Sequence, residues 1–302
     1  MRAIVVDPQA RLGCSFADLA EPSVADGQVL VAVTHASLNR GDLNDARSGR
    51  LAPGAVLGSD VAGTIVEPVP DGSGPAVGTR VVALAAGAFA QRCAVDATAL
   101  APLPPAVDPA QAAALPVAGL AALQALRAAG LAPGKRVLVT GASGGVGHFA
   151  VQIAAHAGAH VIASVGSPGR GDDLTGAGAG EIVIGLDGID EPLDIVLDSV
   201  GGETLTGAWD LLAPGGSLQS IGWSSSEPAT FRPYATVGPP KTLTSFLIGA
   251  PVGDDLATLV TLLASGQLTV DVGWQGSWND LDQAADAMLG RKLRGKAVLE
   301  ID

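Results

Sequence analysis

Hydrophobic and polar residues alternate in short runs over the first hundred positions of the chain. The runs are rich in β-branched residues, and glycine or proline separates each run from the next. The pattern predicts five strands: Ala3–Val6, Val29–His35, Val61–Val66, Arg80–Leu84 and Cys93–Val95. We therefore expect the N-terminal part of the chain to fold as an all-β lobe.

The pattern changes after the proline-rich segment 101–105. Apolar residues then fall at helical spacing in Ala110–Ala114 and Leu120–Ala129, and Pro116 predicts a break between these two helices. From Arg136 onward, apolar runs alternate with helical segments, which is typical of a parallel sheet with helices on both faces. The predicted strands are Val137–Thr140, Val161–Val165, Ile182–Ile184, Ile195–Leu197, Leu218–Ile221 and Thr242–Ile248. This alternation predicts a doubly wound α/β fold of the Rossmann type, which binds dinucleotides.

Beyond residue 250 the strand–helix alternation stops. Two helical segments, Asp254–Ser265 and Leu281–Leu289, precede a final strand-like run, Ala297–Ile301. We expect this tail to fold back onto the N-terminal lobe. The predicted organisation is residues 1–112 as the first segment of one domain, residues 113–250 as a nucleotide-binding domain, and residues 251–302 as a return segment that completes the first domain.

A glycine-rich turn, residues 141–147 with the sequence GASGGVG, joins the first predicted strand of the parallel sheet to the next helix. A helix N-terminus offers unpaired N–H groups and a positive dipole end to a pyrophosphate, and glycine lets the backbone approach it closely. A tight strand–helix turn in any α/β protein has similar glycines, but this turn lies in a full βαβ context. We therefore predict that Ser143, Gly144, Gly145 and Val146 bind a dinucleotide.

The residues after the second strand of this sheet bear on which dinucleotide is bound. A site for NAD usually carries a carboxylate about 20 residues after the glycines, where it binds the ribose 2′-hydroxyl. This chain has no carboxylate there, and Ser164, Ser167 and Arg170 can instead donate hydrogen bonds to a 2′-phosphate. Asp172 and Asp173 weaken this attraction, and the alternative for Arg170 is a solvated loop position. We predict that the cofactor is NADPH.

A second turn, Asp198–Gly202, follows another buried strand of the parallel sheet. Loops at the carboxyl ends of such strands line the ligand crevice. We predict backbone contacts from Val200 and Gly201 to the cofactor, and a structural role for Asp198 in holding the turn.

Composition and charge narrow the range of partners. The chain has 302 residues, of which 48% are hydrophobic and 16% are charged, as expected of a folded α/β protein. Its formal net charge of −13 repels phosphate backbones and anionic lipids, which argues against nucleic acid or a membrane surface as a partner. The sequence shows neither a signal segment nor an apolar stretch long enough to span a bilayer. We therefore expect a cytoplasmic protein that acts on a small molecule.

Several motifs occur in the order and at the spacing of a known family. They are SLNRGD at residues 37–42, LGSDVAGTIV at 57–66, the glycine turn, DSVGG at 198–202 and RGKAVL at 294–299. Together they resemble the medium-chain dehydrogenase/reductase superfamily, and within it the zinc-free quinone oxidoreductase, or zeta-crystallin-like, branch. The resemblance implies a GroES-like β-barrel catalytic domain formed by both chain ends, a central Rossmann domain that binds NADPH, and a homodimer.

Zinc-containing members of this superfamily place a cysteine early in the chain and a His-Glu pair after a later glycine. This chain has Asn39–Asp42 and Gly58–Asp60 in those regions. A catalytic zinc normally needs three protein ligands, so we predict no metal site. Without a Lewis acid, the resemblance implies direct hydride transfer to an activated acceptor, namely a quinone or an α,β-unsaturated carbonyl (enoyl) compound.

The resemblance also nominates residues near the nicotinamide. Asn39 and Asp42 match positions that line the catalytic cleft, and Asn44 stands where this branch often has a tyrosine. Asn44 can donate a hydrogen bond but cannot act as a general acid. The alternatives are a turn-stabilising role for Asn39 and a loop-orienting role for Asp42. Phe246 and Leu247 fall where the last Rossmann strand of the family passes the nicotinamide.

Two hypotheses about function follow. The first is an NADPH-dependent oxidoreductase that reduces quinones or enoyl compounds. The second is a non-catalytic NADPH-binding or scaffold protein of the same fold, suggested by the missing tyrosine and the lack of an obvious acid.

Overall fold

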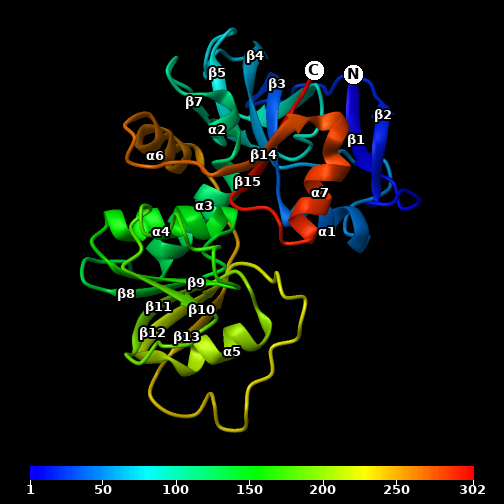
Figure 1. Cartoon of the computed structure of the whole chain (residues 1–302). Coiled ribbons are helices and arrows are strands. Elements are labelled where there is room, and N and C mark those ends of the chain that lie inside the picture. Colours follow the sequence, from blue (N-terminus) through cyan, green and yellow to red (C-terminus); the bar gives the residue numbers. More distant parts are fainter. The chain divides into compact units, whose positions relative to one another are not determined.

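The computed structural model describes all residues from 1 to 302. The chain divides into two compact units (Figure 1). Unit 1 consists of Met1–Leu120 and Ala250–Asp302, and unit 2 consists of Ala121–Gly249. Both chain ends therefore belong to unit 1. None of the helices combines the length and the apolar composition that a membrane span requires.

Unit 1 contains a seven-stranded sheet and a two-stranded sheet. The larger sheet has the order β14-β15-β3-β4-β5-β7, and β6 pairs with β3 beside this path. Its strands are β3 (Gln28–Leu38), β4 (Asp60–Glu67), β5 (Arg80–Leu84), β6 (Arg92–Asp96), β7 (Leu100–Pro102), β14 (Val272–Ser277) and β15 (Lys296–Glu300). In the smaller sheet, β1 (Arg2–Val6) pairs antiparallel with β2 (Cys14–Asp18).

The C-terminal tail joins the sheet that the first hundred residues build. β15 lies antiparallel to β3, with Val298 opposite Ser37, and β14 lies parallel to β15. Ala297, Val298 and Leu299 are completely buried. Complete burial of a valine or leucine side chain contributes about 1.5–3 kcal/mol, which stabilises this register. The register places Lys296 beside the end of β3.

The prediction that the first hundred residues are all β is wrong for residues 40–48, which form helix α1 (Arg40–Ser48). The Asp42 carboxylate accepts the N–H of Asn39 at 2.7 Å, which satisfies one donor at the helix start. Gly49, with φ of 71°, ends the helix. Leu43 and Ala46 are the only buried apolar residues of α1, and two apolar residues are too few to form a repeating pattern at helical spacing.

The other helices outside residues 129–252 agree more closely with the sequence pattern. α2 (Pro109–Ala113) ends before α3 (Pro116–Ala128) begins, so the predicted break at Pro116 is confirmed. In the tail, α6 (Gly253–Ala264) and α7 (Leu281–Leu289) occupy the two segments predicted as helical.

Unit 2 is built on a six-stranded parallel sheet with the order β10-β9-β8-β11-β12-β13. Its strands are β8 (Arg136–Thr140), β9 (His160–Val165), β10 (Glu181–Ile184), β11 (Leu193–Asp198), β12 (Leu212–Ser220) and β13 (Thr242–Ser245). Counted within the unit, this is the order 3-2-1-4-5-6 of doubly wound dinucleotide folds, so the predicted fold class is confirmed. The strand predicted over Thr242–Ile248 ends three residues early, at Ser245.

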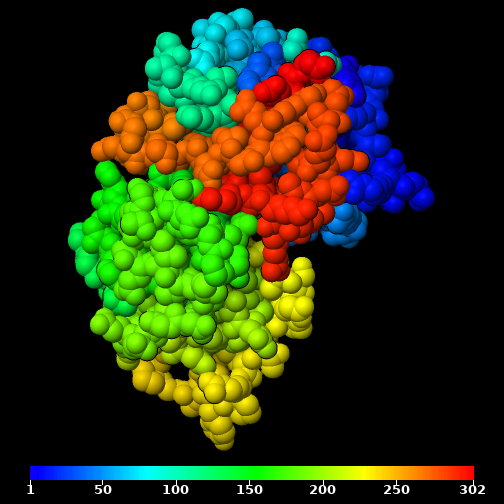
Figure 2. Space-filling model, viewed as in Figure 1, coloured from blue at the N-terminus to red at the C-terminus, as the bar shows by residue number.

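Helices α4 (Gly145–His156) and α5 (Gly202–Asp210) follow β8 and β11. The connections 166–180 and 221–241 contain neither helix nor strand, so they depart from the alternation predicted from the sequence. The second of these connections, coloured yellow, lies at the surface of unit 2 (Figure 2).

Candidate functional site

The glycine turn lies at the point of the unit 2 sheet where the strand order reverses. β8 lies between β9 and β11, so the turn after β8 and the turn after β11 emerge side by side at the carboxyl ends of neighbouring strands. Ligands of doubly wound sheets bind in the crevice at this switch point. The predicted cofactor-binding turns, 141–147 and 198–202, therefore share one edge of one sheet.

Close packing of the backbone explains the glycines of the turn. A Cβ atom added to Gly147 would lie 2.4 Å from the Gly141 carbonyl oxygen and 2.6 Å from the Ala142 Cα. Gly141 itself has φ of 63°, a conformation that side chains disfavour. Gly144 is the N-cap of α4 and brings no side chain to the helix start, where the first N–H groups lack intrahelical partners. The turn thus fits a pyrophosphate group.

Arg170 reaches back to the glycine turn from the connection after β9. Its Nε donates to Ser143 Oγ at 3.0 Å, across 27 residues of sequence. Ser143 is buried and Arg170 is half-buried, so the guanidinium lies against the protein instead of extending into solvent as a surface loop residue would. Two of the residues predicted to bind the cofactor are therefore in direct contact.

The two serines predicted beside Arg170 differ in their surroundings. Ser164, at the end of β9, is buried and donates to the Gly185 carbonyl oxygen at 2.6 Å. Ser167 is exposed in the connection that follows. The Ser164 hydroxyl hydrogen is thus already engaged, whereas the Ser167 side chain is exposed to solvent.

Asp198 holds the second turn. It is completely buried, accepts the Thr140 hydroxyl at 2.6 Å, and accepts the N–H groups of Gly201 at 2.8 Å and Val200 at 3.4 Å. Burial raises the pKa of Asp198, while these hydrogen bonds favour the charged form. The structural role predicted for Asp198 matches these contacts.

Trp223 covers the second turn from the connection after β12. A Cβ atom at Gly201, which has φ of 74°, would lie 2.6 Å from the Trp223 ring. Position 201 therefore has no room for a side chain, which explains the glycine there. Phe246 and Leu247 follow β13; Phe246 is half-buried, and Leu247 is 88% exposed.

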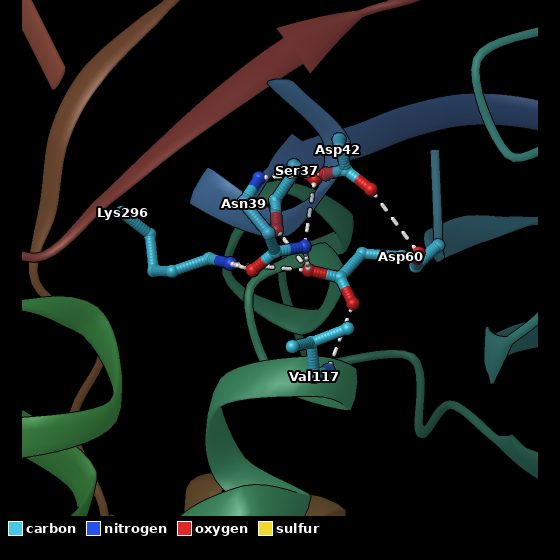
Figure 3. Close-up of polar contacts among 7 residues, drawn as sticks. Ser37, Asn39, Asp42, Asp60, Val117 and Lys296 are labelled. Atoms are coloured by element: carbon cyan, nitrogen blue, oxygen red, sulfur yellow. Dashed lines mark hydrogen bonds and ion pairs between the residues drawn. The ribbon is translucent and has the colours of Figure 1, made fainter. Parts of the chain in front are cut away.

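A second polar cluster lies in unit 1 and is centred on Asp60 (Figure 3). Asp60 Oδ2 accepts hydrogen bonds from Ser37 Oγ at 2.5 Å, Asn39 Nδ2 at 2.9 Å and Lys296 Nζ at 3.1 Å. Asp60 Oδ1 accepts the N–H of Val117 at 2.8 Å. Asp60 and Ser37 are completely buried, and Lys296 is 4% exposed. We call these residues, together with Asp42 and Ser59, the Asp60 cluster.

The predicted catalytic residues occupy different parts of this region. The Asn39 side chain belongs to the Asp60 cluster, since its Oδ1 accepts Lys296 Nζ at 2.5 Å. Asp42 accepts the Asn39 N–H and the Ser59 hydroxyl, the latter at 3.1 Å. Burial, reinforced by the nearby charge of Asp60, raises the pKa of Asp42 to about 7. Asn44 is exposed on α1 and lies outside the cluster.

Sequence reasoning missed Asp60 and Lys296 as site residues. Both lie in motifs already noted, at 57–66 and 294–299, and each is the first residue of a largely apolar strand. Once such a charge is buried it needs a partner, because an unpaired charge is rarely buried. The identity of that partner depends on the pairing of β15 with β3, which sequence pattern did not supply.

The Asp60 cluster does not fit a zinc ion. The carboxylate oxygens of Asp42 and Asp60 all accept hydrogen bonds, and the Lys296 ammonium already lies 3.1 Å from Asp60. Nowhere does the structure gather three or more His, Cys, Asp or Glu side chains in an arrangement that could hold a metal ion. A tetrahedral zinc site with three protein ligands has no counterpart among these residues.

Two known families match this chain. Residues 25–105 match the alcohol dehydrogenase GroES-like domain, and residues 145–265 match the zinc-binding dehydrogenase family. The first match lies in unit 1. The second begins at α4 and includes five strands of the parallel sheet.

Two similar proteins match over most of their own length. The acrylyl-CoA reductase AcuI from Ruegeria pomeroyi is 34% identical over 267 residues, a match that covers 78% of this chain and 79% of AcuI. The quinone oxidoreductase from Thermus thermophilus, also solved in complex with NADPH, is 31% identical with a TM-score of 0.82. That match covers 99% of this chain and 100% of the other.

Other relatives are far longer than this chain. The spectinabilin polyketide synthase protein NorB from Streptomyces orinoci is 40% identical over 209 residues, which is 66% of this chain. The matched region is 10% of NorB, so this chain corresponds to a small part of that synthase.

Proposed function

The chain belongs to the medium-chain dehydrogenase/reductase superfamily, in its quinone oxidoreductase-like branch, and on this premise we propose that it is an NADPH-dependent, zinc-independent reductase. The cofactor supplies a hydride, and the acceptor is a quinone or an α,β-unsaturated carbonyl (enoyl) compound. The names of the Thermus thermophilus and Ruegeria pomeroyi proteins support these two acceptor classes.

The observation that carries the proposal is the contact between Arg170 and the glycine turn. The turn offers helix N–H groups to a pyrophosphate, and Arg170 lies 3.0 Å from Ser143 within that turn. A guanidinium beside the pyrophosphate site, with no carboxylate at the end of β9, suits the 2′-phosphate of NADPH better than the 2′-hydroxyl of NADH.

Replacing Arg170 with alanine tests the cofactor assignment. A hydrogen bond to a charged group is worth about 1.5–3 kcal/mol, so we expect the KM for NADPH to rise about tenfold or more. The KM for NADH should change little. Arg232→Ala is the matched control, because Arg232 is an exposed arginine of unit 2 that pairs with Asp210. Equal effects of Arg170→Ala on both cofactors would remove the assignment.

We propose that Asn39 and Asp42 act by holding the start of α1, and that neither transfers a proton. Asn39 is bonded to Asp60 and Lys296, and both Asp42 oxygens accept hydrogen bonds from Ser59 and the Asn39 backbone. Asn44 has no acidic proton, so a proton for the reduced product comes from solvent or from another group.

NADPH oxidation measured against a panel of quinones and enoyl thioesters tests the activity itself. We expect turnover with at least one acceptor class, without added metal and in the presence of a chelator. Tight NADPH binding with no turnover across the panel would instead favour the non-catalytic scaffold hypothesis. If a chelator abolishes the activity and added zinc restores it, the proposal that the reductase works without zinc would be contradicted.

We also propose a homodimer, as the family resemblance implies. β13 is an edge strand of the parallel sheet, and Leu247, directly after it, is 88% exposed. An exposed strand edge with apolar side chains favours association with another chain. Light scattering that finds a monomer of 29.8 kDa at micromolar concentration would contradict this proposal.

A further inference from the structure

An indole side chain lies just beyond the carboxyl end of a strand of the parallel sheet. Trp223 is in the connection after β12, three residues past the last strand residue, Ser220. It is 44% exposed, whereas Trp209, the other tryptophan of unit 2, is 7% exposed. A single exposed apolar side chain is common, so the significance of Trp223 depends on where and how firmly its ring is held.

Two contacts fix the indole ring. A Cβ atom at Gly201 would meet three ring atoms of Trp223 at 2.6–2.9 Å, so Gly201 lies against one flat face of the indole. At the ring edge, Nε1 donates to the Glu227 carbonyl oxygen at 2.6 Å. The ring therefore has little conformational freedom left to lose when a ligand stacks on it.

Backbone hydrogen bonds fix the connection itself to the second turn. The N–H groups of Ile221 and Gly222 donate to the Asp198 carbonyl oxygen at 2.8 and 3.2 Å. The Ser225 N–H donates to the Val200 carbonyl oxygen at 2.9 Å. These bonds do not involve the indole, so a variant of Trp223 keeps them and tests the ring alone.

The strand order assigns Trp223 to one half of the dinucleotide site. A doubly wound sheet has a mononucleotide-binding half on each side of its switch point. The contact between Arg170 and Ser143 lies at the ends of β9 and β8, on the side proposed to take the adenosine 2′-phosphate. β9, β8, β11 and β12 are successive neighbours, so Trp223 belongs to the other half, which receives the nicotinamide (Figure 1). Three strand spacings of about 4.8 Å separate β9 from β12, roughly the span of an extended dinucleotide.

The attraction between an indole and a nicotinamide ring depends on the redox state of the cofactor. NADPH gives a hydride to the acceptor, which also takes up a proton, and is left as NADP⁺, whose nicotinamide ring is a pyridinium cation. The face of an indole attracts a cation through its quadrupole, more strongly than the ring of phenylalanine or tyrosine does. The neutral ring of NADPH gains only the stacking contact.

We propose that Trp223 stacks on the nicotinamide ring and stabilises its positive charge, so that it shifts the affinity of the site toward NADP⁺ relative to NADPH. The same attraction acts on the charge that develops during hydride transfer, which makes Trp223 a catalytic residue. This inference rests on the proposed reductase function and adds to it a residue outside the glycine turn.

Affinities for the two cofactor forms, measured by calorimetry without an acceptor, test the inference apart from turnover. Trp223→Leu should raise the Kd of NADP⁺ about fivefold more than the Kd of NADPH, as expected for the loss of a cation–π contact. Trp223→Phe keeps an aromatic face and should give an intermediate value. Trp209→Phe is the matched control, because Trp209 also donates its Nε1–H to this connection, at the Ala235 carbonyl oxygen, and it should change neither Kd.

Fluorescence gives a second readout, one that a purely structural role of Trp223 would not produce. A pyridinium ring quenches indole emission on contact, and NADP⁺ does not absorb the emitted light. We expect NADP⁺ to quench the unmodified protein and Trp209→Phe, and Trp223→Phe to lose most of this quenching. The other three of the four tryptophans supply the unquenched background.

Three results would overturn the inference: equal changes in the Kd of NADP⁺ and of NADPH in Trp223→Leu, quenching that persists in Trp223→Phe, or a loss of NADP⁺ affinity in Glu227→Gln as selective as that in Trp223→Leu. The last result would assign the charge stabilisation to the Glu227 carboxylate. The expected response to Arg170→Ala with no effect of Trp223→Leu would refute this inference alone. Failure of the unmodified protein to bind either cofactor form would refute the proposed function as well.

Discussion

Replacing Lys296 with methionine should destabilise unit 1 strongly. Methionine keeps the length and most of the volume of lysine but removes the ammonium that lies 3.1 Å from the Asp60 carboxylate. Asp60 has no exposed surface, so water cannot replace the lost partner. Asn39 Oδ1 loses its donor as well.

The expected cost follows from the distance and the burial. At an effective dielectric constant of about 20, two unit charges separated by 3.1 Å interact by roughly 5 kcal/mol. Breaking a buried ion pair by removing one partner costs about 3–5 kcal/mol, because the remaining charge is left uncompensated. We expect a loss of that size, which is a large fraction of the roughly 5–15 kcal/mol that stabilises a typical protein.

Urea unfolding followed by circular dichroism measures this loss. Lys292→Met is the control, since Lys292 is an exposed lysine of the same segment and its replacement should cost less than about 0.5 kcal/mol. Adding Asp60→Asn to Lys296→Met removes the carboxylate charge that has lost its partner, and should recover about 2 kcal/mol of the free energy of unfolding. A cost below about 1 kcal/mol for Lys296→Met, or no recovery in the double variant, would refute the reasoning.

Two further variants test the candidate site. Gly147→Ala places a Cβ atom 2.4 Å from the Gly141 carbonyl oxygen. We expect NADPH affinity, measured by fluorescence titration, to fall at least tenfold. Gly41→Ala is the control, because no atom lies within 4 Å of its Cβ, and it should leave NADPH affinity unchanged. The pKa of Asp42 is raised from 3.8 to about 7, so Asp42 binds a proton more tightly in the folded protein than in the unfolded chain. Its contribution to the free energy of unfolding therefore falls as the pH rises from about 4 to 7. Asp42→Asn lacks this contribution, so its stability relative to the unmodified protein should improve over that pH range; parallel pH profiles of Tm would contradict the assignment.

Much of unit 2 could be predicted because its signals are local. A buried strand of a parallel sheet reads as a short apolar run, and β8 and β9 appear in the sequence almost at their observed bounds. The glycine turn is also local, since its close contacts join residues 141, 142 and 147. The connections 166–180 and 221–241 follow no periodicity, and the sequence pattern did not show that they lack helices.

Helix α1 and the Asp60 cluster could not be predicted in this way. α1 buries only Leu43 and Ala46 among its apolar residues, so this short helix contains a single apolar pair at helical spacing and no longer repeat. Asn39 and Asp42 were nominated through a family resemblance, and that resemblance did not reveal that Asn39 bonds Lys296.

The sequence by itself determined where the glycine turn lies, because glycine is required by backbone contacts within seven residues of chain. Only the tertiary structure decided which charges meet in unit 1. Asp60 and Lys296 are 236 residues apart, and they meet because β15 pairs with β3 in one register. That register depends on which strand faces become buried in the folded unit, and no local stretch of sequence specifies it.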